Sequence, residues 1–224
     1  MRALKAVIFD LDGVVVDSHP AHKRAWTTLF HSLHVEISDT EMAFILEGHR
    51  REDILRHFLG DITPGQMQEY GARKEALFKD SMLELKTISG VRGFLTQVEA
   101  AGLAIALGSS ASRRRVEDTL DRLDLKRCFR VIVTGDDVAQ GKPDPAIFRQ
   151  AALGMGVAPE NILVCEDAVA GVEAAKAAGM KCLAISANGQ GHLLEKAGAG
   201  RVVPDFTSVR LEDLRGLFEP AGAK

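Results

Sequence analysis

The chain has 224 residues, of which 46% are apolar and 26% charged, and its formal net charge is −3. This is an ordinary globular composition, with room for one large domain or a domain with an insert, and it gives no reason to expect nucleic-acid binding. There is no secretion signal and no apolar run long enough to span a membrane, so we expect a cytoplasmic monomer without nucleic-acid or membrane partners. Three widely spaced cysteines favour reduced, buried thiols over a zinc site or a disulfide framework.

The first predicted element is a strand at residues 6–9, followed directly by two acidic residues. Asp10 and Asp12 flank one leucine and precede Gly13. Carboxylates at the C-terminal end of a strand lie where open parallel sheets bind ligands, and they can hold a divalent cation and transfer protons. However, Asp-Gly between apolar runs is also a strong signal for a hairpin turn. Taken alone, the segment favours the hairpin.

Residues 20–85 contain no convincing strand and instead suggest helices. The predicted helical segments are residues 20–33, one opened by a capping box at 38–41, residues 51–59, and a longer one opened at 63–66. We therefore predict an all-helical cap domain at residues 18–87, inserted into a core formed by residues 1–17 and 88–224. An insert that leaves and re-enters the sheet near the acidic pair could act as a mobile lid.

From residue 90 onward, strand and helix patterns alternate. The predicted strands are residues 103–107, 131–133, 162–165 and 182–185, and the predicted helices are residues 112–123, 143–153 and 168–178. The strands are apolar runs without polar alternation, which indicates burial on both faces. We therefore predict an α/β fold with a Rossmann-like parallel sheet covered by helices.

A small, hydroxyl-rich loop at residues 108–112 follows the second of these strands. Its backbone N–H groups and hydroxyls can bind an anion at the start of the next helix, although Ser112 is also a suitable helix N-cap. Arginines fill positions 113–115, the first turn of that helix, where cations oppose the helix dipole. An anionic ligand would relieve this conflict, whereas arginines that point into solvent would be screened.

A second acidic pair, Glu166 and Asp167, follows the strand at 162–165. Two acidic pairs at the ends of parallel strands could converge on a hard cation such as Mg²⁺, which prefers oxygen ligands. Asp167 could instead cap the following helix. Lys142, which precedes a proline, could neutralise the repulsion between a carboxylate and a phosphate, although a lysine in this position is more often simply exposed.

Taken together, four motifs in this order resemble the haloacid dehalogenase-like superfamily of phosphotransferases, over most of the chain. The motifs occupy residues 10–14, 108–112, 141–145 and 166–172. The helical insert resembles the small cap of the branch that contains β-phosphoglucomutase and sugar-phosphate phosphatases. The resemblance is specific for the superfamily and much less specific for the substrate.

The resemblance implies that Asp10 is the nucleophile and forms an aspartyl-phosphate. It further implies that Asp12 acts as general acid and then as general base, while Ser110 and Lys142 hold phosphoryl oxygens. The metal is expected to be Mg²⁺, and its implied ligands are Asp10, Asp12 through the backbone carbonyl, Glu166 and Asp167.

The resemblance also implies substrate-binding residues in the cap and in the serine loop. They are His22, Gly48, Arg51, Lys79, Ser109, Ala111, Ser112 and Arg113. His22 could couple cap closure to the proton transfers of Asp12. The sequence departs from the mutase pattern at Ser18, Glu47 and Arg114, where the mutase has threonine, lysine and asparagine.

These features predict a Mg²⁺-dependent phosphohydrolase of small phosphorylated sugars. The alternative is a β-phosphoglucomutase that interconverts β-glucose 1-phosphate and glucose 6-phosphate. The two differ in what attacks the aspartyl-phosphate, because water gives a phosphatase whereas a sugar hydroxyl gives a mutase.

Overall fold

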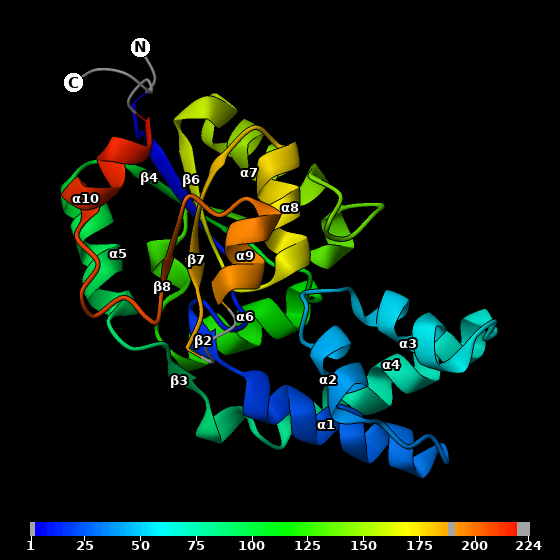
Figure 1. Ribbon diagram of the computed structural model, residues 1–224. Helices are drawn as coiled ribbons and strands as arrows, with labels where there is room; N and C mark the ends of the chain where they lie inside the picture. The colour runs from blue at the N-terminus through cyan, green and yellow to red at the C-terminus, as the bar shows by residue number, and fades with distance from the viewer. Residues whose placement is uncertain (1–2, 188–190, 219–224) are drawn as a thin grey trace.

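The computed structural model describes residues 3–187 and 191–218, and the ends of the predicted core at residues 1–2 and 219–224 lie outside the described residues (Figure 1). Its main sheet is six-stranded, with the order β5-β4-β1-β6-β7-β8 and parallel pairing throughout. The strands are β1 (Ala6–Phe9), β4 (Ala104–Gly108), β5 (Val131–Val133), β6 (Ile162–Glu166), β7 (Lys181–Ile185) and β8 (Arg201–Val203). The predicted α/β fold is confirmed. Of these six strands only β8 was not predicted, because it begins with Arg201 and so contains just two consecutive apolar residues.

Helices cover both faces of the sheet (Figure 1). One face carries α5 (Val91–Ala100), α6 (Arg113–Arg122) and α10 (Leu211–Arg215), and the other carries α7 (Ala146–Met155), α8 (Val169–Ala177) and α9 (Gly191–Ala197). In β1, Val7 and Phe9 pack into the first core while Ala6 and Ile8 pack into the second. Because alternate side chains are buried on opposite faces, the strand reads as a continuous apolar run.

The helix at 143–153 was predicted to begin at Pro143, but α7 begins at Ala146. The Asp144 carboxylate accepts the Ala146 N–H at 2.8 Å and so holds a turn before the helix starts. Short 3₁₀ turns occupy Met82–Glu84, Lys126–Cys128, Gly135–Asp137, Pro159–Asn161 and Gly216–Phe218. Within the described ranges, no helix combines the length and apolar character needed to cross a bilayer. Cys165 and Cys182 are buried free thiols as predicted, whereas Cys128 is only half-buried.

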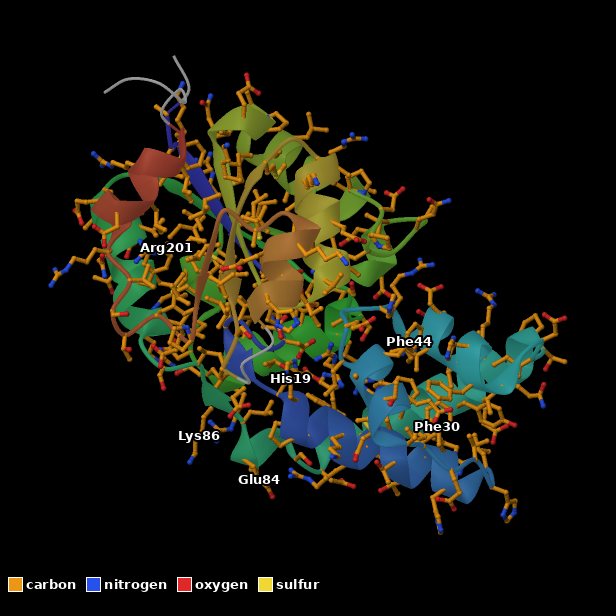
Figure 2. The ribbon with its side chains drawn as sticks, in the orientation of Figure 1. His19, Phe30, Phe44, Glu84, Lys86 and Arg201 are labelled. Atoms are coloured by element: carbon orange, nitrogen blue, oxygen red, sulfur yellow. The ribbon has the colours of Figure 1, made fainter. Side chains whose placement is uncertain are left out.

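Four helices form the insert, and we call α1–α4 the helical insert: α1 (His19–Ser32), α2 (Asp39–Ile45), α3 (Arg51–Leu59) and α4 (Pro64–Lys79). Both predicted capping boxes are present, at Ser38 and Thr63. The insert has a hydrophobic cluster separate from the two cores of the sheet, centred on Trp26, Phe30 and Leu55. Figure 2 shows Phe30 and Phe44 inside this helical layer, away from the sheet.

A short antiparallel pair connects the insert to the sheet: β2 (Val16–Asp17) pairs with β3 (Lys86–Thr87). Before β2 the chain turns tightly, with Gly13 N–H donating to the Val16 carbonyl at 2.8 Å. Gly13 has a φ of +73°, and a Cβ there would overlap the side chains of Asp167 and His19. The turn favoured by the Asp-Gly sequence therefore exists, but the hairpin is wrong, because β2 pairs with β3 and not with β1.

Candidate active site

The parallel register brings the predicted acidic residues to one edge of the sheet. Phe9 is level with Leu107 of β4 on one side and with Cys165 of β6 on the other. Asp10 therefore emerges between the serine loop and Glu166. A pocket opens at this edge between the sheet and the helical insert. Its walls include Asp10, Asp12, His19, His22, Gly48, Arg51, Lys74, Glu75, Ser110, Ala111, Ser112, Arg115, Glu166 and Asp167.

Lys142 is buried against Asp10 and Glu166, which line the pocket, and does not lie on the surface. Its Nζ is 2.5 Å from Asp10 Oδ1 and 2.5 Å from Glu166 Oε1, and its side chain is 1% exposed. Although burial opposes the charged form, the two carboxylates raise the pKa of Lys142 above its ordinary value. The alternative of an exposed lysine is therefore wrong.

Asp10 is a buried carboxylate that shares its cation with a second carboxylate. Burial raises the pKa of Asp10 well above its ordinary value, Lys142 offsets this only in part, and Glu166 raises it further. Because Lys142 is shared by Asp10 and Glu166, its single positive charge does not balance both carboxylates when they are ionised, and this edge of the sheet is then negative.

At the end of β6, the backbone N–H groups that precede α8 are bound by Glu166 and not by Asp167. Glu166 Oε2 accepts the N–H groups of Asp167, at 2.8 Å, and of Ala168, at 3.0 Å. Glu166, and not Asp167, thus covers the free N–H groups before α8, so the capping alternative for Asp167 is wrong. Gly171 makes this possible, because a Cβ there would overlap the Glu166 carboxylate.

Asp167 is paired with His19, a residue that the sequence analysis missed. His19 Nε2 lies 3.1 Å from Asp167 Oδ2. Although burial opposes protonation, the hydrogen bond and charge of Asp167 raise the pKa of His19 to about 9. His19 starts α1, and Figure 2 shows it where the insert meets the sheet. Its place in the first helical turn after the acidic segment was the only signal that could have identified it.

The donor set at this edge suits a hard divalent cation. In residues 3–187 and 191–218, no three acidic, histidine or cysteine side chains converge on one point. Asp10 Oδ2 and Asp167 Oδ1 nevertheless accept no hydrogen bond from the described residues. Burial raises the pKa of both carboxyls, and acidic neighbours raise them further, as expected of oxygens short of positive charge. Free carboxylate oxygens of this kind fit Mg²⁺.

Asp12 is held by four hydrogen bonds. Arg115 donates from Nη1 to Oδ1 at 2.9 Å and from Nη2 to Oδ2 at 2.6 Å, and Ser18 Oγ donates to Oδ1 at 2.6 Å. His22 Nε2 lies 3.3 Å from the same oxygen. Burial opposes ionisation, yet Arg115 and His22 hold the pKa of Asp12 well below its ordinary value. In this state Asp12 is an ionised, fully engaged carboxylate.

The three arginines at the start of α6 have different environments. Arg115 is buried and paired with Asp12, so the anion that relieves its conflict with the helix dipole is part of the protein itself. Arg113 does not line the pocket, because it pairs with Asp137 at 2.6 Å. Arg114 is 84% exposed on its side chain, in agreement with the solvent alternative for that residue.

The serine loop contributes one hydroxyl that is ready to bind a ligand. Ser110 Oγ is buried and has no hydrogen-bond partner among the described residues. Ser112 caps α6 as predicted, and Ala111 and Ser112 line the pocket. Ser109 lies behind the pocket wall, where its Oγ accepts the Ala111 N–H at 3.2 Å. The free Ser110 hydroxyl is the kind of group that would donate to a phosphoryl oxygen.

On the insert side, the structure places Lys74 in the pocket and leaves Lys79 exposed outside it. Lys74 Nζ is 3.6 Å from Glu75 and lies over the rings of Phe78 and Trp26, at 4.8 and 5.5 Å. Burial, with the nearby arginines, lowers the pKa of Lys74 to about 8. Lys74 lies one helical turn before Phe78 on the buried face of α4, and this spacing could have identified it.

His22, Gly48 and Arg51, which were predicted to bind substrate, line the pocket. Burial, followed by the charge of Lys74, lowers the pKa of His22 to about 3, so the ring is neutral and can donate its Nε2–H to Asp12. Arg51 forms an ion pair with Glu52 at 2.5 Å and a longer one with Glu75 at 3.8 Å. The insert thus presents two cations to the pocket: Arg51, which is closely paired with Glu52, and Lys74, whose pair with Glu75 is long.

Comparison with known proteins agrees with this geometry. A family model described as haloacid dehalogenase-like hydrolase matches residues 7–185. A phosphorylated carbohydrates phosphatase from Thermotoga maritima is 32% identical over 89% of this chain and 94% of its own length. A β-phosphoglucomutase from Bacillus subtilis is 33% identical over 96% of both chains. The crystal structure of a β-phosphoglucomutase from Clostridium difficile is 26% identical, with a TM-score of 0.87 over 96% of this chain and 97% of that one.

Proposed function

The chain belongs to the haloacid dehalogenase-like hydrolase family, and we propose that it is a Mg²⁺-dependent phosphatase of small phosphorylated sugars. Its relatives include phosphatases and phosphoglucomutases, so a phosphohydrolase is the activity that they support. The observation that carries the proposal is the grouping of Asp10, Lys142 and Ser110. A buried carboxylate beside a fixed ammonium and a free hydroxyl is suited to attack on a phosphoryl group.

In the first step, a carboxylate oxygen of Asp10 attacks phosphorus, and the bond between phosphorus and the sugar oxygen breaks. Lys142 and Ser110 donate hydrogen bonds to the phosphoryl oxygens, which become more negative as the bonds exchange. Asp12 gives its proton to the departing sugar oxygen. Arg115 occupies both oxygens of Asp12 and keeps it ionised, so this role requires the guanidinium to shift when substrate binds and Asp12 to take up a proton from solvent beforehand.

In the second step, water attacks the phosphorus of the aspartyl-phosphate. Asp12, now ionised, takes a proton from that water, and the bond from phosphorus to Asp10 breaks to regenerate the carboxylate. Arg115, Ser18 and His22 fix the orientation of the Asp12 carboxylate for this transfer. The products are inorganic phosphate and the free sugar.

Bound Mg²⁺ would supply charge compensation between the attacking carboxylate and the phosphate dianion. Asp10 and Asp167 would hold it through their free oxygens, with the Asp12 carbonyl completing the set and Glu166 contributing through water. Glu166 would act indirectly because both its oxygens are already engaged, by Lys142 and by backbone N–H groups.

We further propose that residues 18–87 form a cap domain that closes over the substrate. The separate hydrophobic cluster of the insert and the narrow β2–β3 connection support this division. Closure would bring the guanidinium of Arg51 and the ammonium of Lys74 against the part of the substrate that faces away from Asp10.

A β-phosphoglucomutase is the second candidate, because a mutase relative aligns over 96% of both chains and the insert presents cations that could hold a second phosphate. The two reactions share every step up to the aspartyl-phosphate. The reactions differ in the next step, in which either water or a sugar hydroxyl attacks the aspartyl-phosphate.

The test is a screen of phosphorylated sugars, β-glucose 1-phosphate among them, with Mg²⁺ and with excess EDTA. The proposal expects Mg²⁺-dependent release of inorganic phosphate, and thermal denaturation that shifts upward when Mg²⁺ is added to the metal-free protein. Formation of glucose 6-phosphate without phosphate release would favour the mutase. Equal turnover in EDTA, or no thermal shift with Mg²⁺, would refute the metal requirement.

A further inference from the structure

Arg50 connects the helical insert to the core outside the pocket. It is the residue before α3, in extended conformation, and its side chain does not cap that helix. Its Nη1 instead donates to the carbonyls of two core residues, Ala139 at 2.9 Å and Val138 at 3.4 Å. Its Nε donates to Asp53 at 3.2 Å, which holds the guanidinium in this direction. The side chain is 18% exposed, so a charged group is largely buried between insert and core.

The core provides space for this side chain at Gly141. A Cβ on Gly141 would lie 2.7 Å from Arg50 Cγ and 3.0 Å from both Cδ and Nε, closer than carbon atoms normally approach. Gly141 is not among the glycines with positive φ, so its backbone does not itself require glycine. Glycine at position 141 is therefore explained by the room that the Arg50 side chain needs.

The loop that accepts Arg50 leads directly into the reactive edge. Residues 138–141 end at Lys142, whose Nζ contacts Asp10 and Glu166. The loop before Arg50 also lies near this lysine, since a Cβ built on Gly48 would be 4.0 Å from Lys142 Cδ. The residue after Arg50 is Arg51, which lines the pocket. One short segment of the insert thus carries both a fixation to the core and a substrate-facing cation.

We propose that Arg50 is a positioning residue that fastens the closed helical insert onto the loop of residues 138–141, with Gly141 as its receptor. The fastening holds Arg51 over the pocket and keeps Lys142 against Asp10. The catalytic part of this inference rests on the proposed function, whereas the fastening itself does not.

The side chain of Arg50 contributes little to the internal stability of the insert. Its two carbonyl acceptors belong to the core, and its pair with Asp53 of α3 is an i,i+3 ion pair to a carboxylate that is 37% exposed, which is worth little. Loss of Arg50 should therefore release the insert from the core without unfolding it. This outcome distinguishes a positioning residue from a purely structural one. If Arg50 were purely structural, its loss would lower the unfolding temperature and leave the loop of residues 138–141 unaffected.

The experiment compares Arg50→Ala, Gly141→Ala and the double variant, with Arg56→Ala as a matched control, because Arg56 is an exposed arginine of the same helix. Hydrogen–deuterium exchange is followed in peptides covering residues 47–55 and 136–142. We expect both single variants to exchange faster in both peptides, with Arg56→Ala unchanged. Thermal unfolding should stay within the error of the wild-type protein.

Activity provides the second readout, measured on the best substrate of the phosphorylated-sugar screen. We expect kcat/KM to fall about 10-fold in Arg50→Ala, as for loss of a charge-assisted hydrogen bond, chiefly through a higher KM. Arg50→Lys should recover part of this loss. The double variant should be no worse than Arg50→Ala, because an added Cβ at Gly141 only matters when it obstructs Arg50.

Unchanged exchange in Arg50→Ala would overturn the fastening. The same would follow if Gly141→Ala lowered kcat/KM equally in wild-type and Arg50→Ala backgrounds. If the wild-type protein releases no phosphate from any phosphorylated sugar, the proposed function is wrong. Hydrogen–deuterium exchange still tests whether Arg50 fastens the insert to the core. If the protein is active and Arg50→Ala matches it, the fastening fails alone.

Discussion

The sheet edge and the helical insert line the same pocket but hold their charged groups differently. At the sheet edge, Lys142 touches two carboxylates at 2.5 Å, and Arg115 grips Asp12 with two hydrogen bonds. On the insert, Arg51 is held at 2.5 Å by Glu52 of its own helix, but the pair of Lys74 with Glu75 is long, at 3.6 Å. The sheet edge is therefore already organised, whereas Lys74 on the insert is loosely paired and can exchange partners.

This difference assigns separate tasks to the two regions. Groups that stabilise a developing charge work best when they are fixed in advance, since no reorganisation is then needed during the reaction. Groups that select a substrate must release it again, and loosely paired cations on a movable element can do so. Substitutions at the sheet edge should thus abolish turnover or stability, and substitutions on the insert should change substrate affinity.

The largest effect is expected for Asp10→Asn, which removes the proposed nucleophile. Turnover of any phosphorylated sugar should fall by at least about 10³-fold. The fold should persist, because burial already disfavours the Asp10 charge and Lys142 keeps its contact with Glu166. Phosphate release and circular dichroism measure the two outcomes, with exposed Asp61→Asn as control. Near-wild-type turnover would rule out Asp10 as nucleophile.

The pair of Arg115 and Asp12 should dominate stability at the sheet edge. Arg115→Met is expected to destabilise the protein by about 3 kcal/mol at pH 7, because it leaves a buried carboxylate without its cation. The folded pKa of Asp12 is depressed, so its contribution is present above the unfolded pKa of about 3.8 and is lost as pH falls through the folded value. Urea unfolding across this range measures the cost.

A double-mutant cycle with Asp12→Asn sharpens the test of this pair. In the Asp12→Asn background, removal of Arg115 should cost much less, because no carboxylate remains to be neutralised. Equal costs in both backgrounds would mean that Arg115 stabilises α6 by packing, for example on the Phe78 ring at 5.0 Å, and not through Asp12.

On the insert, Lys74→Met should reduce substrate affinity without abolishing turnover. We expect KM to rise about 10-fold, as for loss of a charged hydrogen-bond donor, while exposed Lys79→Met should change it by less than about 2-fold. The pKa of Lys74 is about 8, so its charge is lost as pH rises through that value. The wild-type KM should therefore rise above pH 8, and the KM of Lys74→Met should stay flat. A larger effect at Lys79 would contradict the pocket assignment.

The smallest effect concerns His19, at the joint between the two regions. In the metal-free protein its pKa is about 9, above the unfolded value of 6.5, so its contribution is complete below pH 6.5 and disappears as pH rises through 9. Because 38% of the side chain is exposed, we expect no more than about 1 kcal/mol. Chemical unfolding of His19→Gln in EDTA should show this deficit at pH 6 and none at pH 9.5. A constant deficit at both values would exclude the ion pair with Asp167.

Much of the site could be predicted because it lies at the ends of strands. An apolar run that stops at Asp10 or Glu166 specifies where a buried strand ends, and parallel strands carry such ends to one edge. Asp10 and Ser110 were identified in this way, whereas Lys142 was identified only from its motif in the order of the other three, and the geometry of all three residues suits the roles predicted for them. Those roles, and the monomeric state, stay predictions.

The insert was less predictable, because position on a helix does not say which way a residue faces until the helices pack. Lys79 and Lys74 lie on the same helix, yet only Lys74 turns toward the pocket. Similarly, of three consecutive arginines the sequence analysis placed Arg113 among the substrate-binding residues, but the orientation of α6 sends Arg115 inward and leaves Arg114 in solvent.

The sequence by itself determined the α/β fold, the capping boxes of the insert and the order of the acidic, hydroxyl and basic groups along the chain, because these depend on local patterns. The tertiary structure decided which cation meets which anion. Asp12 and Arg115 are 103 positions apart, Asp10 and Lys142 are 132 apart, and Arg50 meets Ala139 across 89. No local pattern encodes such pairs, because they form only when the strands have assembled into the sheet and the insert is packed against it.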